Sequence, residues 1–376
     1  MKKETSSRVV TGVFVGYLGA MTILQFVTAD RSFSERENRY LQTIPKFSFS
    51  ELFQGDFTED FEDYCADQFP FRDHWITLNA RYEQFTGKKE TNGVFLCEGE
   101  RLITPFSAPD ASSLRRRVMA VEALREKIRV PLTLALIPDS AELYGELLPK
   151  GAPCDSQESL IESIRQMTEI PMADLLTPLR QHKNDGKDLF YRTDHHWTSY
   201  GAYFGYQGLC DALGMESIPI ERFTPQTVSE SFYGTAYSSS GYTWIAPDHM
   251  ERYVDPTSAV KVVSYQGGEE KEIPLYKEES LTVKDKYTYF LGGNTPRSIL
   301  YGQDESLPKL LLLRDSYTDS LAPFLLSHFS EIHLLDMRYY LGSPAEYVEE
   351  NGIDQVVVMY SVSNFCEQNG VLAIAE

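Results

Sequence analysis

An uncharged apolar segment near the N-terminus places the strongest constraint on how this chain folds. It runs from Val9 to Ala29 without a single Asp, Glu, Lys or Arg. As a helix it would reach roughly 30 Å, which matches the hydrocarbon core of a bilayer. A core helix of a soluble protein normally keeps a polar face, and this segment has only scattered Thr and Gln residues. We therefore expect a membrane-spanning helix over residues 9–29.

The charges that flank this segment predict its orientation. Basic residues precede it, and Asp30 follows it directly. Because positively charged flanks stay on the cytoplasmic side, residues 1–8 are expected in the cytoplasm and the rest of the chain outside. A cleaved signal peptide is the alternative, since Val27 and Ala29 suit a signal-peptidase site. The apolar segment exceeds the roughly 7–15 residues of a signal-peptide core, which favours an uncleaved single-pass anchor in the cell membrane.

The acidic composition excludes several classes of partner. The formal net charge is −20 at pH 7, which argues against binding to nucleic acid or to an anionic lipid surface. The five cysteines are Cys65, Cys97, Cys154, Cys210 and Cys366. They are scattered, odd in number and without a CxxC pair, so they predict neither a zinc site nor a disulfide framework. We expect no cofactor.

Beyond the apolar segment, buried strands alternate with helices. Residues 30–50 are polar and predict a linker, and residues 51–376 form the expected outer domain. The expected strands are 130–138, 309–313, 332–335 and 355–359, and the expected helices are 56–66, 111–127, 157–168, 198–213 and 316–329. Such alternation is typical of an α/β fold with a parallel sheet covered by helices on both faces.

One stretch interrupts this alternation. Residues 220–305 are rich in Tyr, Ser, Gly, Thr and Val, and they contain alternating segments at 259–264 and 287–290. Alternation with a period of two favours strands and hairpins. We expect a β-rich insertion in the α/β frame.

A serine follows the most apolar of the predicted strands. Leu310 to Leu313 are four consecutive leucines, and Ser316 stands at the turn into the next helix. Active sites of open α/β sheets lie beyond the carboxyl ends of the strands. Free backbone N–H groups at a helix start can stabilise an alkoxide or an oxyanion. The alternative is that Ser316 only caps the helix, a role that serine often fills.

The second candidate is the motif Asp194-His195-His196-Trp197. In an extended segment Asp194 and His196 share a face, so the carboxylate can fix the tautomer of the imidazole. A metal site with Asp194, His195 and His196 as ligands is one alternative, but no further ligand pair stands nearby. A plain surface turn is another. Because a serine nucleophile needs a base and the base needs an orienting group, we predict that Ser316, His196 and Asp194 act together without a metal.

Several blocks of this sequence resemble the DHHW protein family, whose name matches residues 194–197. The further blocks are Ser34–Leu41, Pro45–Ser48, Phe61–Tyr64, Asp67–Asp73, Asn92–Phe95, Pro138-Asp139, Leu291–Asn294, Arg314–Tyr317 and Ala322–Leu325. The family is similar to the alginate O-acetyltransferase accessory proteins, which belong to the SGNH-hydrolase-like superfamily. One departure is Ser140, which stands where the family pattern leads us to expect a lysine.

The resemblance implies an SGNH-hydrolase-like fold with Ser316 as nucleophile, His196 as base and Asp194 as the group that orients the base. The three residues stand in the reverse of the usual chain order, as in the permuted alginate-acetylation branch, and geometry rather than chain order defines such a triad. The resemblance also implies Gly293 and Asn294 as oxyanion donors. A plain turn is the alternative for these two, since Gly-Gly-Asn is typical turn chemistry.

Three functions are compatible with this site. The first, which we prefer, is a cell-surface polysaccharide O-acyltransferase, most simply an O-acetyltransferase, that works through an acyl-serine. The resemblance implies a membrane-bound O-acyltransferase as the partner that supplies the acyl group and a polysaccharide as the acceptor. The second is a glycan acetylesterase with the same triad. The third is a non-catalytic glycan-binding or scaffold protein, because a fold alone does not establish an activity.

Overall fold

The computed structural model describes residues 2–34, 36–37, 39–255 and 260–376. The chain divides into two compact units. The smaller unit comprises Met1–Lys88 with Gly241–Thr243, and the larger unit comprises Lys89–Ser240 with Trp244–Glu376.

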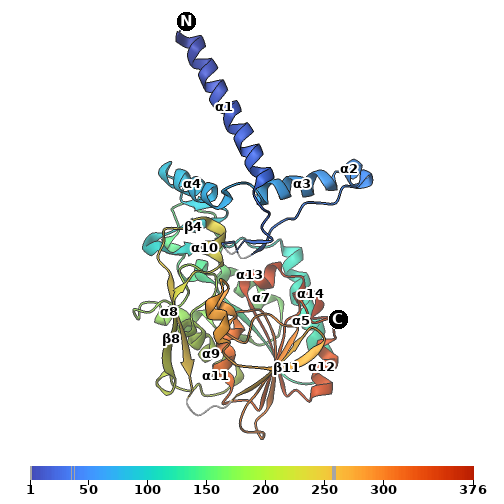
Figure 1. The fold of residues 1–376 in the computed structure, drawn as a ribbon. Helices are drawn as coiled ribbons and strands as arrows, with labels where there is room; N and C mark the ends of the chain where they lie inside the picture. The colour runs from blue at the N-terminus through green and yellow to red at the C-terminus, as the bar shows by residue number, and fades with distance from the viewer. Residues whose placement is uncertain (1, 35, 38, 256–259) are drawn as a thin grey trace. The chain divides into compact units, whose positions relative to one another are not determined.

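The smaller unit is helical (Figure 1). Its long helix α1 spans Lys2–Val27, and among the described residues its segment Ser7–Val27 is the one helix long and apolar enough to cross a membrane. The short strands β1 (Phe33–Ser34) and β2 (Arg39–Tyr40) then pair antiparallel within the predicted linker. The remaining helices are α2 (Phe49–Gln54), α3 (Asp56–Asp67) and α4 (Arg72–Phe85). The helix expected at residues 56–66 is therefore confirmed as α3.

The larger unit is built on an eight-stranded sheet. Its strand order is β11-β10-β12-β14-β13-β15-β6-β7. The parallel strands are β6 (Leu132–Ile137), β7 (Met172–Ala173), β13 (Lys309–Arg314), β14 (Glu331–Leu335) and β15 (Gln355–Ser361). The antiparallel strands are β10 (Lys261–Gln266), β11 (Glu269–Ile273) and β12 (Arg297–Tyr301). The predicted α/β class with a mostly parallel sheet is confirmed.

Helices cover both faces of this sheet. Alternate residues of its central strand β13 point to opposite faces, so each face packs against its own layer of helices. Leu310 and Leu312 of β13 belong to one hydrophobic cluster, and Leu311 and Leu313 belong to another. Figure 1 shows α9 (Ser199–Leu213) and α11 (Thr318–Leu325) on one side of the sheet. It shows α5 (Ala111–Lys127) and α12 (Pro344–Asn351) on the other. Helix α7 (Gln157–Met167) also contributes to the second cluster.

The segment 220–305 divides its strands between two places. Strands β8 (Thr224–Phe232) and β9 (Asp248–Val254) form a separate antiparallel pair, whereas β10, β11 and β12 extend the main sheet. The strand expected at residues 287–290 is wrong, because Lys286–Tyr289 forms a 3-10 helix. Its tyrosines turn into the larger unit, and packing there overrides their β propensity. Residue 259 of the other expected strand lies outside the described residues, and residues 261–264 of that strand belong to β10.

Candidate active site

The Asp194-His195-His196 motif lies in a tight loop rather than in an extended segment. Phe190 and Trp197 form an antiparallel bridge that closes the loop. The backbone N–H of His196 donates to Asp194 Oδ1 at 2.9 Å. An Asx-type turn of this kind folds the carboxylate back over the residue two positions on. Asp194 and His196 therefore meet as predicted, but through a bend and not through the shared face of a strand.

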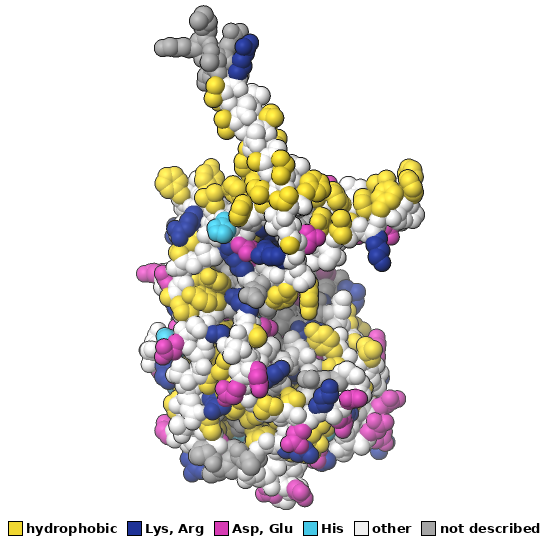
Figure 2. All heavy atoms as spheres, viewed as in Figure 1, with side chains coloured by type: hydrophobic (Ala, Val, Ile, Leu, Met, Phe, Trp, Pro, Cys, Tyr) yellow, Lys and Arg dark blue, Asp and Glu magenta, His cyan; other side chains and the backbone are white. Residues whose placement is uncertain are grey.

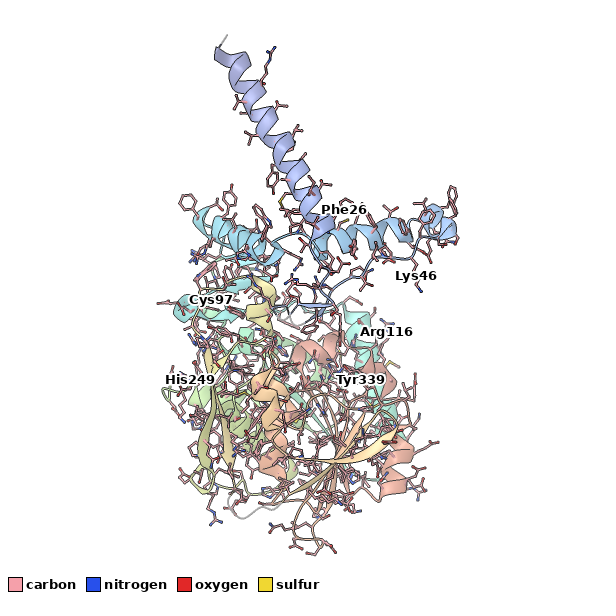
Figure 3. The ribbon with its side chains drawn as sticks, viewed as in Figure 1. Phe26, Lys46, Cys97, Arg116, His249 and Tyr339 are labelled. Carbon is pink, nitrogen blue, oxygen red and sulfur yellow. The ribbon has the colours of Figure 1, made fainter. Side chains whose placement is uncertain are left out.

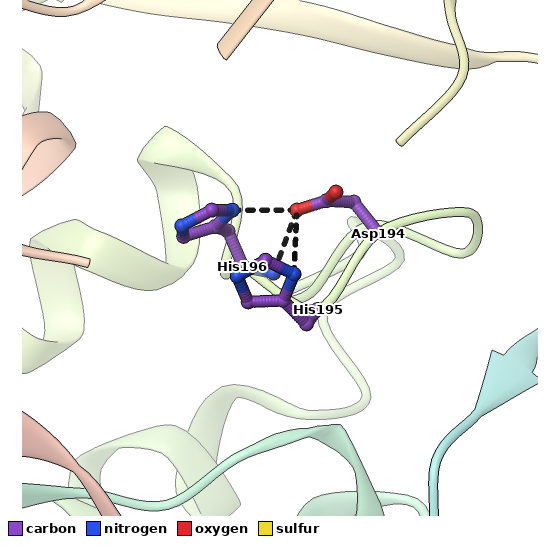
Figure 4. Close-up of side chains that lie close together, drawn as sticks. All are labelled: Asp194, His195 and His196. Atoms are coloured by element: carbon purple, nitrogen blue, oxygen red, sulfur yellow. Dashed lines mark hydrogen bonds and ion pairs between the residues drawn. The ribbon is translucent and has the colours of Figure 1, made fainter. Parts of the chain in front are cut away.

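A continuous line of hydrogen bonds joins Asp194, His196 and Ser316. His196 Nδ1 lies 2.6 Å from Asp194 Oδ1 (Figure 4). His196 Nε2 lies 2.8 Å from Ser316 Oγ. Asp194 and His196 are buried, and Ser316 is partly exposed. With its Nδ1 proton held by the carboxylate, the neutral imidazole has Nε2 free to accept the serine proton.

Ser316 lies between the end of β13 and the start of α11. The expected helix 316–329 is shorter than predicted, since α11 begins at Thr318 after Tyr317 at the N-cap. The Ser316 side chain faces His196 and does not cap the helix. Among the described residues, its backbone N–H has no hydrogen-bond acceptor. This N–H is therefore available to an oxyanion on a group attached to Ser316 Oγ.

Asp315 fixes the turn that carries Ser316. Its Oδ1 accepts the Tyr317 N–H at 3.1 Å, and its Oδ2 accepts the Ser361 N–H at 2.8 Å. The Asn364 side-chain amide donates to the same Oδ2 at 2.8 Å. Because Ser361 ends the neighbouring strand β15, the serine turn is tied to the carboxyl edge of the sheet.

Residues of the 220–305 segment hold the far side of the Asp194 carboxylate. Thr235 donates to Asp194 Oδ2 from its N–H at 2.7 Å and from its hydroxyl at 3.1 Å. Gly234 packs so closely that a Cβ atom there would collide with the carboxylate. Burial raises the pKa of Asp194, but the adjacent His195 and His196 and the hydrogen bonds outweigh it and hold the pKa well below 3.8. The carboxylate is therefore ionised beside His196.

His195 turns its side chain toward Thr235. Its side chain is 42% exposed, and its Nδ1 lies 2.6 Å from the Thr235 hydroxyl. Desolvation, aided by the nearby His196, lowers the pKa of His195 below its ordinary value. Asp194, His195 and His196 do offer possible metal-ligand atoms within 4.8 Å of one another. In the structure these groups are engaged by hydrogen bonds to Ser316 and Thr235, an arrangement that favours acid–base chemistry.

Tyr287 is a part of the site that the sequence did not indicate. Its ring stacks on the His196 imidazole, with 3.7 Å between the ring centroids and 9° between the planes. Its hydroxyl lies 3.0 Å from Ser320 Oγ. Desolvation raises the pKa of this phenol well above its ordinary value, so the ring stays neutral. No local pattern marks Tyr287, since it reaches the site through the fold of the 3-10 segment.

Two reciprocal hydrogen bonds tie the histidine loop to the serine turn. Trp197 Nε1 donates to the Tyr317 carbonyl oxygen at 2.9 Å. The Tyr317 hydroxyl donates in return to the His195 carbonyl oxygen. The indole of Trp197 also packs against Gly205 of α9, where a Cβ atom would lie 2.6 Å from the ring. Each bond joins a neighbour of His196 to the neighbour of Ser316.

A buried ion pair lies beneath the serine turn. Arg314 Nη1 lies 2.9 Å from Asp319 Oδ1, and both side chains are almost fully buried. Desolvation raises the pKa of Asp319 to about 7, against the opposing effect of Arg314. Removing Asp319 would leave the buried Arg314 guanidinium charged and unpaired, which typically costs about 3–5 kcal/mol.

The predicted oxyanion donors Gly293 and Asn294 form a turn. Gly292 and Gly293 both have positive φ angles, of 75° and 94°, and the Gly293 N–H donates to the Phe290 carbonyl oxygen at 3.4 Å. Asn294 is exposed. Among the described residues, neither Gly293 nor Asn294 makes a hydrogen bond to Ser316. Their oxyanion role stays a prediction.

A known protein family matches part of the larger unit. Residues 96–269 match the family described as "SGNH hydrolase-like domain, acetyltransferase AlgX". This stretch contains Asp194 and His196, whereas Ser316 lies beyond it. The protein named "Probable alginate O-acetylase AlgJ" of Azotobacter vinelandii is 26% identical over 209 residues, covering 53% of this chain and 50% of its own length. The chain therefore spans about half the length of the curated relatives that it matches.

Solved structures of similar fold extend the comparison. A DHHW family protein from Eubacterium siraeum has a TM-score of 0.65 at 22% identity, covering 76% of this chain and 95% of its own. PatB1 of Bacillus cereus, solved with a sulfonyl adduct, has a TM-score of 0.62 at 19% identity, covering 72% and 95%. The predicted resemblance is confirmed: this chain has an SGNH hydrolase-like α/β fold and is similar to the DHHW and alginate O-acetylation proteins.

Proposed function

We propose that this chain is a polysaccharide O-acyltransferase, with acetyl as the group transferred, that works through an acyl-serine at Ser316. The observation that carries the proposal is the unbroken line of hydrogen bonds from Asp194 through His196 to Ser316. A serine hydroxyl is a weak nucleophile unless an adjacent base takes its proton and a third group orients that base. All three parts lie at hydrogen-bond distance.

The first half of the reaction loads the serine. Ser316 Oγ attacks the carbonyl carbon of the acyl donor while its proton moves to His196 Nε2. The negative oxygen of the tetrahedral intermediate accepts the Ser316 N–H, with Gly293 and Asn294 as the predicted further donors. Collapse of the intermediate breaks the bond to the leaving group, which takes the proton from His196. An acyl ester on Ser316 remains.

The second half of the reaction transfers the acyl group from Ser316 to the acceptor. A sugar hydroxyl attacks the ester carbonyl and gives its proton to His196 Nε2. When this intermediate collapses, Ser316 Oγ leaves and recovers a proton from His196, and the acyl group is then esterified to the polysaccharide. Asp194 stays ionised throughout and stabilises the imidazolium.

The names of the relatives support a polysaccharide acceptor. The AlgJ proteins are named as alginate O-acetylases, which favours a polysaccharide acceptor.

We propose that α1 is an uncleaved anchor, that residues 1–8 lie in the cytoplasm and that residues 51–376 act outside. Because acyl-coenzyme A donors are cytoplasmic, a membrane-bound O-acyltransferase is the proposed partner that delivers the acyl group. No metal or cofactor enters the proposed steps.

The test is a single-turnover acylation of the full chain in mild detergent with p-nitrophenyl acetate. Mass spectrometry is expected to find an acetyl group on Ser316, and an added polysaccharide acceptor is expected to remove it. Ser316→Ala and His196→Gln are expected to abolish the adduct. Ser327→Ala, an exposed serine just beyond α11, is the matched control and is expected to acylate normally.

Two other outcomes would assign the alternative functions. Release of acetate to water at the same rate with and without acceptor would indicate the esterase. The absence of any adduct on Ser316, even with the donor in large excess, would indicate the non-catalytic binding protein.

A further inference from the structure

Helix α4 presents an aromatic stripe to its surroundings. Phe71, Trp75, Leu78, Tyr82 and Phe85 recur at alternating spacings of four and three, which aligns them along one side of a helix. All five are exposed, Phe85 to 90%. The opposite side of α4 faces its own unit, where Ala80 is fully buried. Trp75 also makes an edge-on ring contact with Tyr17 of α1, and the rest of the stripe is apolar surface that the packing of the smaller unit leaves uncovered.

Helices α2 and α3 carry a similar surface. Phe47, Phe49, Phe57 and Phe61 form a row of ring contacts with centroid distances of 5.0, 5.3 and 6.0 Å. Phe53 is exposed to 87%. Figure 2 shows hydrophobic side chains gathered over α1 and over these helices. The carboxylates of α3 that lie away from its Phe row are Asp56, Glu59, Glu62 and Asp63.

Helices α3 and α4 both contact residues that lie just beyond the end of α1. Tyr64 of α3 donates to Asp30 at 3.1 Å. Arg31 pairs with Asp73 of α4 at 3.0 Å, and Gln68 accepts the Arg31 N–H at 3.0 Å. Since α1 ends at Val27, only three residues, or about 10 Å of extended chain, separate the end of the apolar helix from these contacts.

The position of α3 and α4 beside the end of α1 indicates that a lipid bilayer covers their aromatic residues. A helix that leaves a bilayer at Val27 places α3 and α4 at the level of the lipid headgroups. Phe, Trp and Tyr are the residues enriched at that level, and amphipathic helices bury an apolar face there to about 5–10 Å. Phe26 of α1, 85% exposed, continues the apolar surface (Figure 3). The uncovered aromatic residues form rows along the helices, whereas exposed apolar residues of an ordinary soluble protein are scattered singly.

We infer that α2, α3 and α4 form an interfacial platform that lies on the outer surface of the bilayer beside α1. The aromatic rows enter the boundary between headgroups and acyl chains, and the acidic side of α3 faces water. The inference rests on the proposed anchor α1 but not on acyl transfer.

Quenching of added tryptophans in the full chain, reconstituted in phosphatidylcholine vesicles, tests the platform. Phe53→Trp and Phe85→Trp are made in a Trp75→Phe background, and Glu59→Trp on the acidic side of α3 is the matched control. Lipids brominated on the acyl chain are expected to remove most of the fluorescence added at positions 53 and 85, while aqueous iodide leaves it. The reverse is expected at position 59.

Two results would overturn the platform. Iodide quenching at positions 53 and 85, equal to that at 59, would show that both rows face water. Protection from both quenchers would show that protein, such as a second copy of this chain, covers them. Because no acyl donor is present, neither result depends on whether Ser316 is acylated.

Discussion

The imidazole of His196 lies flat against the phenol ring of Tyr287, 3.7 Å away and within 9° of parallel. Asp194 fixes which imidazole nitrogen carries the proton, and the tyrosine ring fixes the plane in which the imidazole lies. A base held in both respects meets the serine in one geometry, which lowers the entropic cost of reaching the transition state.

Removal of the ring is therefore expected to impair acylation more than removal of the hydroxyl. Tyr287→Leu should lower kcat/KM for p-nitrophenyl acetate by about tenfold or more, because the imidazole plane is released. Tyr287→Phe keeps the stack and loses only the bond to Ser320, so a change within about threefold is expected. Equal losses in the two variants would assign the effect to the hydroxyl. Thermal melting of both variants controls for misfolding.

Asp194→Asn is expected to lower kcat by about 10³-fold or more, because an amide at that position can hold the imidazole in the wrong tautomer. The burst of p-nitrophenol in single-turnover experiments measures this loss. His195→Gln is the matched control, since His195 contacts Thr235 and not the serine, and a loss below about tenfold is expected. A milder effect of Asp194→Asn than of His195→Gln would contradict the assigned roles.

The same carboxylate makes the stability depend on pH. The pKa of Asp194 in the folded chain lies below its ordinary value of 3.8. Its stabilising contribution is therefore present above about pH 4 and is lost as the pH falls further. Asp194→Asn is expected to be less stable than the wild type at pH 7 by about 2 kcal/mol, and the gap should narrow at pH 3. Urea unfolding at pH 7, 5 and 3 measures it, and a gap independent of pH would refute the ionised state.

Gly234→Ala is expected to displace the Asp194 carboxylate, with a cost of about 1–3 kcal/mol in the free energy of unfolding and a loss of acylation. Gly145→Ala is the control, because a Cβ atom at Gly145 meets nothing within 4 Å. Denaturant titration and the acylation burst are measured together. Normal behaviour of the Gly234 variant would show that the carboxylate has room to move.

Metal chelation separates the triad from the metal-site alternative. EDTA is expected to leave acylation unchanged, because Asp194, His195 and His196 act through hydrogen bonds. Added Zn²⁺ is expected to inhibit reversibly, since these residues offer ligand atoms within 4.8 Å of one another. Loss of activity in EDTA, restored by a metal, would instead support a metal centre.

The sequence predicted those features that depend on local pattern. The four leucines of β13 indicated a strand buried on both faces, and both faces are covered. The strand-to-helix turn indicated Ser316, and the motif spacing indicated Asp194 and His196. The predicted backbone conformation between Asp194 and His196 was wrong. The two residues meet through an Asx-type bend, which competes with the extended backbone that their spacing implied.

The parts that were missed come to the site from far along the chain. Thr235 and Tyr287 belong to the 220–305 segment, and only its three-dimensional course brings them to Asp194 and His196. Alternating Tyr and Thr residues have a high propensity for β-strands, so the local pattern predicted a strand at residues 287–290. Burial of the Tyr287 ring, rather than this propensity, stabilises the 3-10 helix that is found there. A buried pair such as Arg314 with Asp319 likewise has no signature in sequence spacing.

The paired bonds of Trp197 and Tyr317 have a consequence for the middle of the catalytic cycle. Once Ser316 is esterified, its oxygen has no proton to give, and the direct link between nucleophile and base is gone. The indole and the phenol still connect the segments on either side. These two hydrogen bonds keep the His196 imidazole beside the Ser316 ester after the direct hydrogen bond between them is lost. The base is therefore already in position to accept the proton of the incoming sugar hydroxyl.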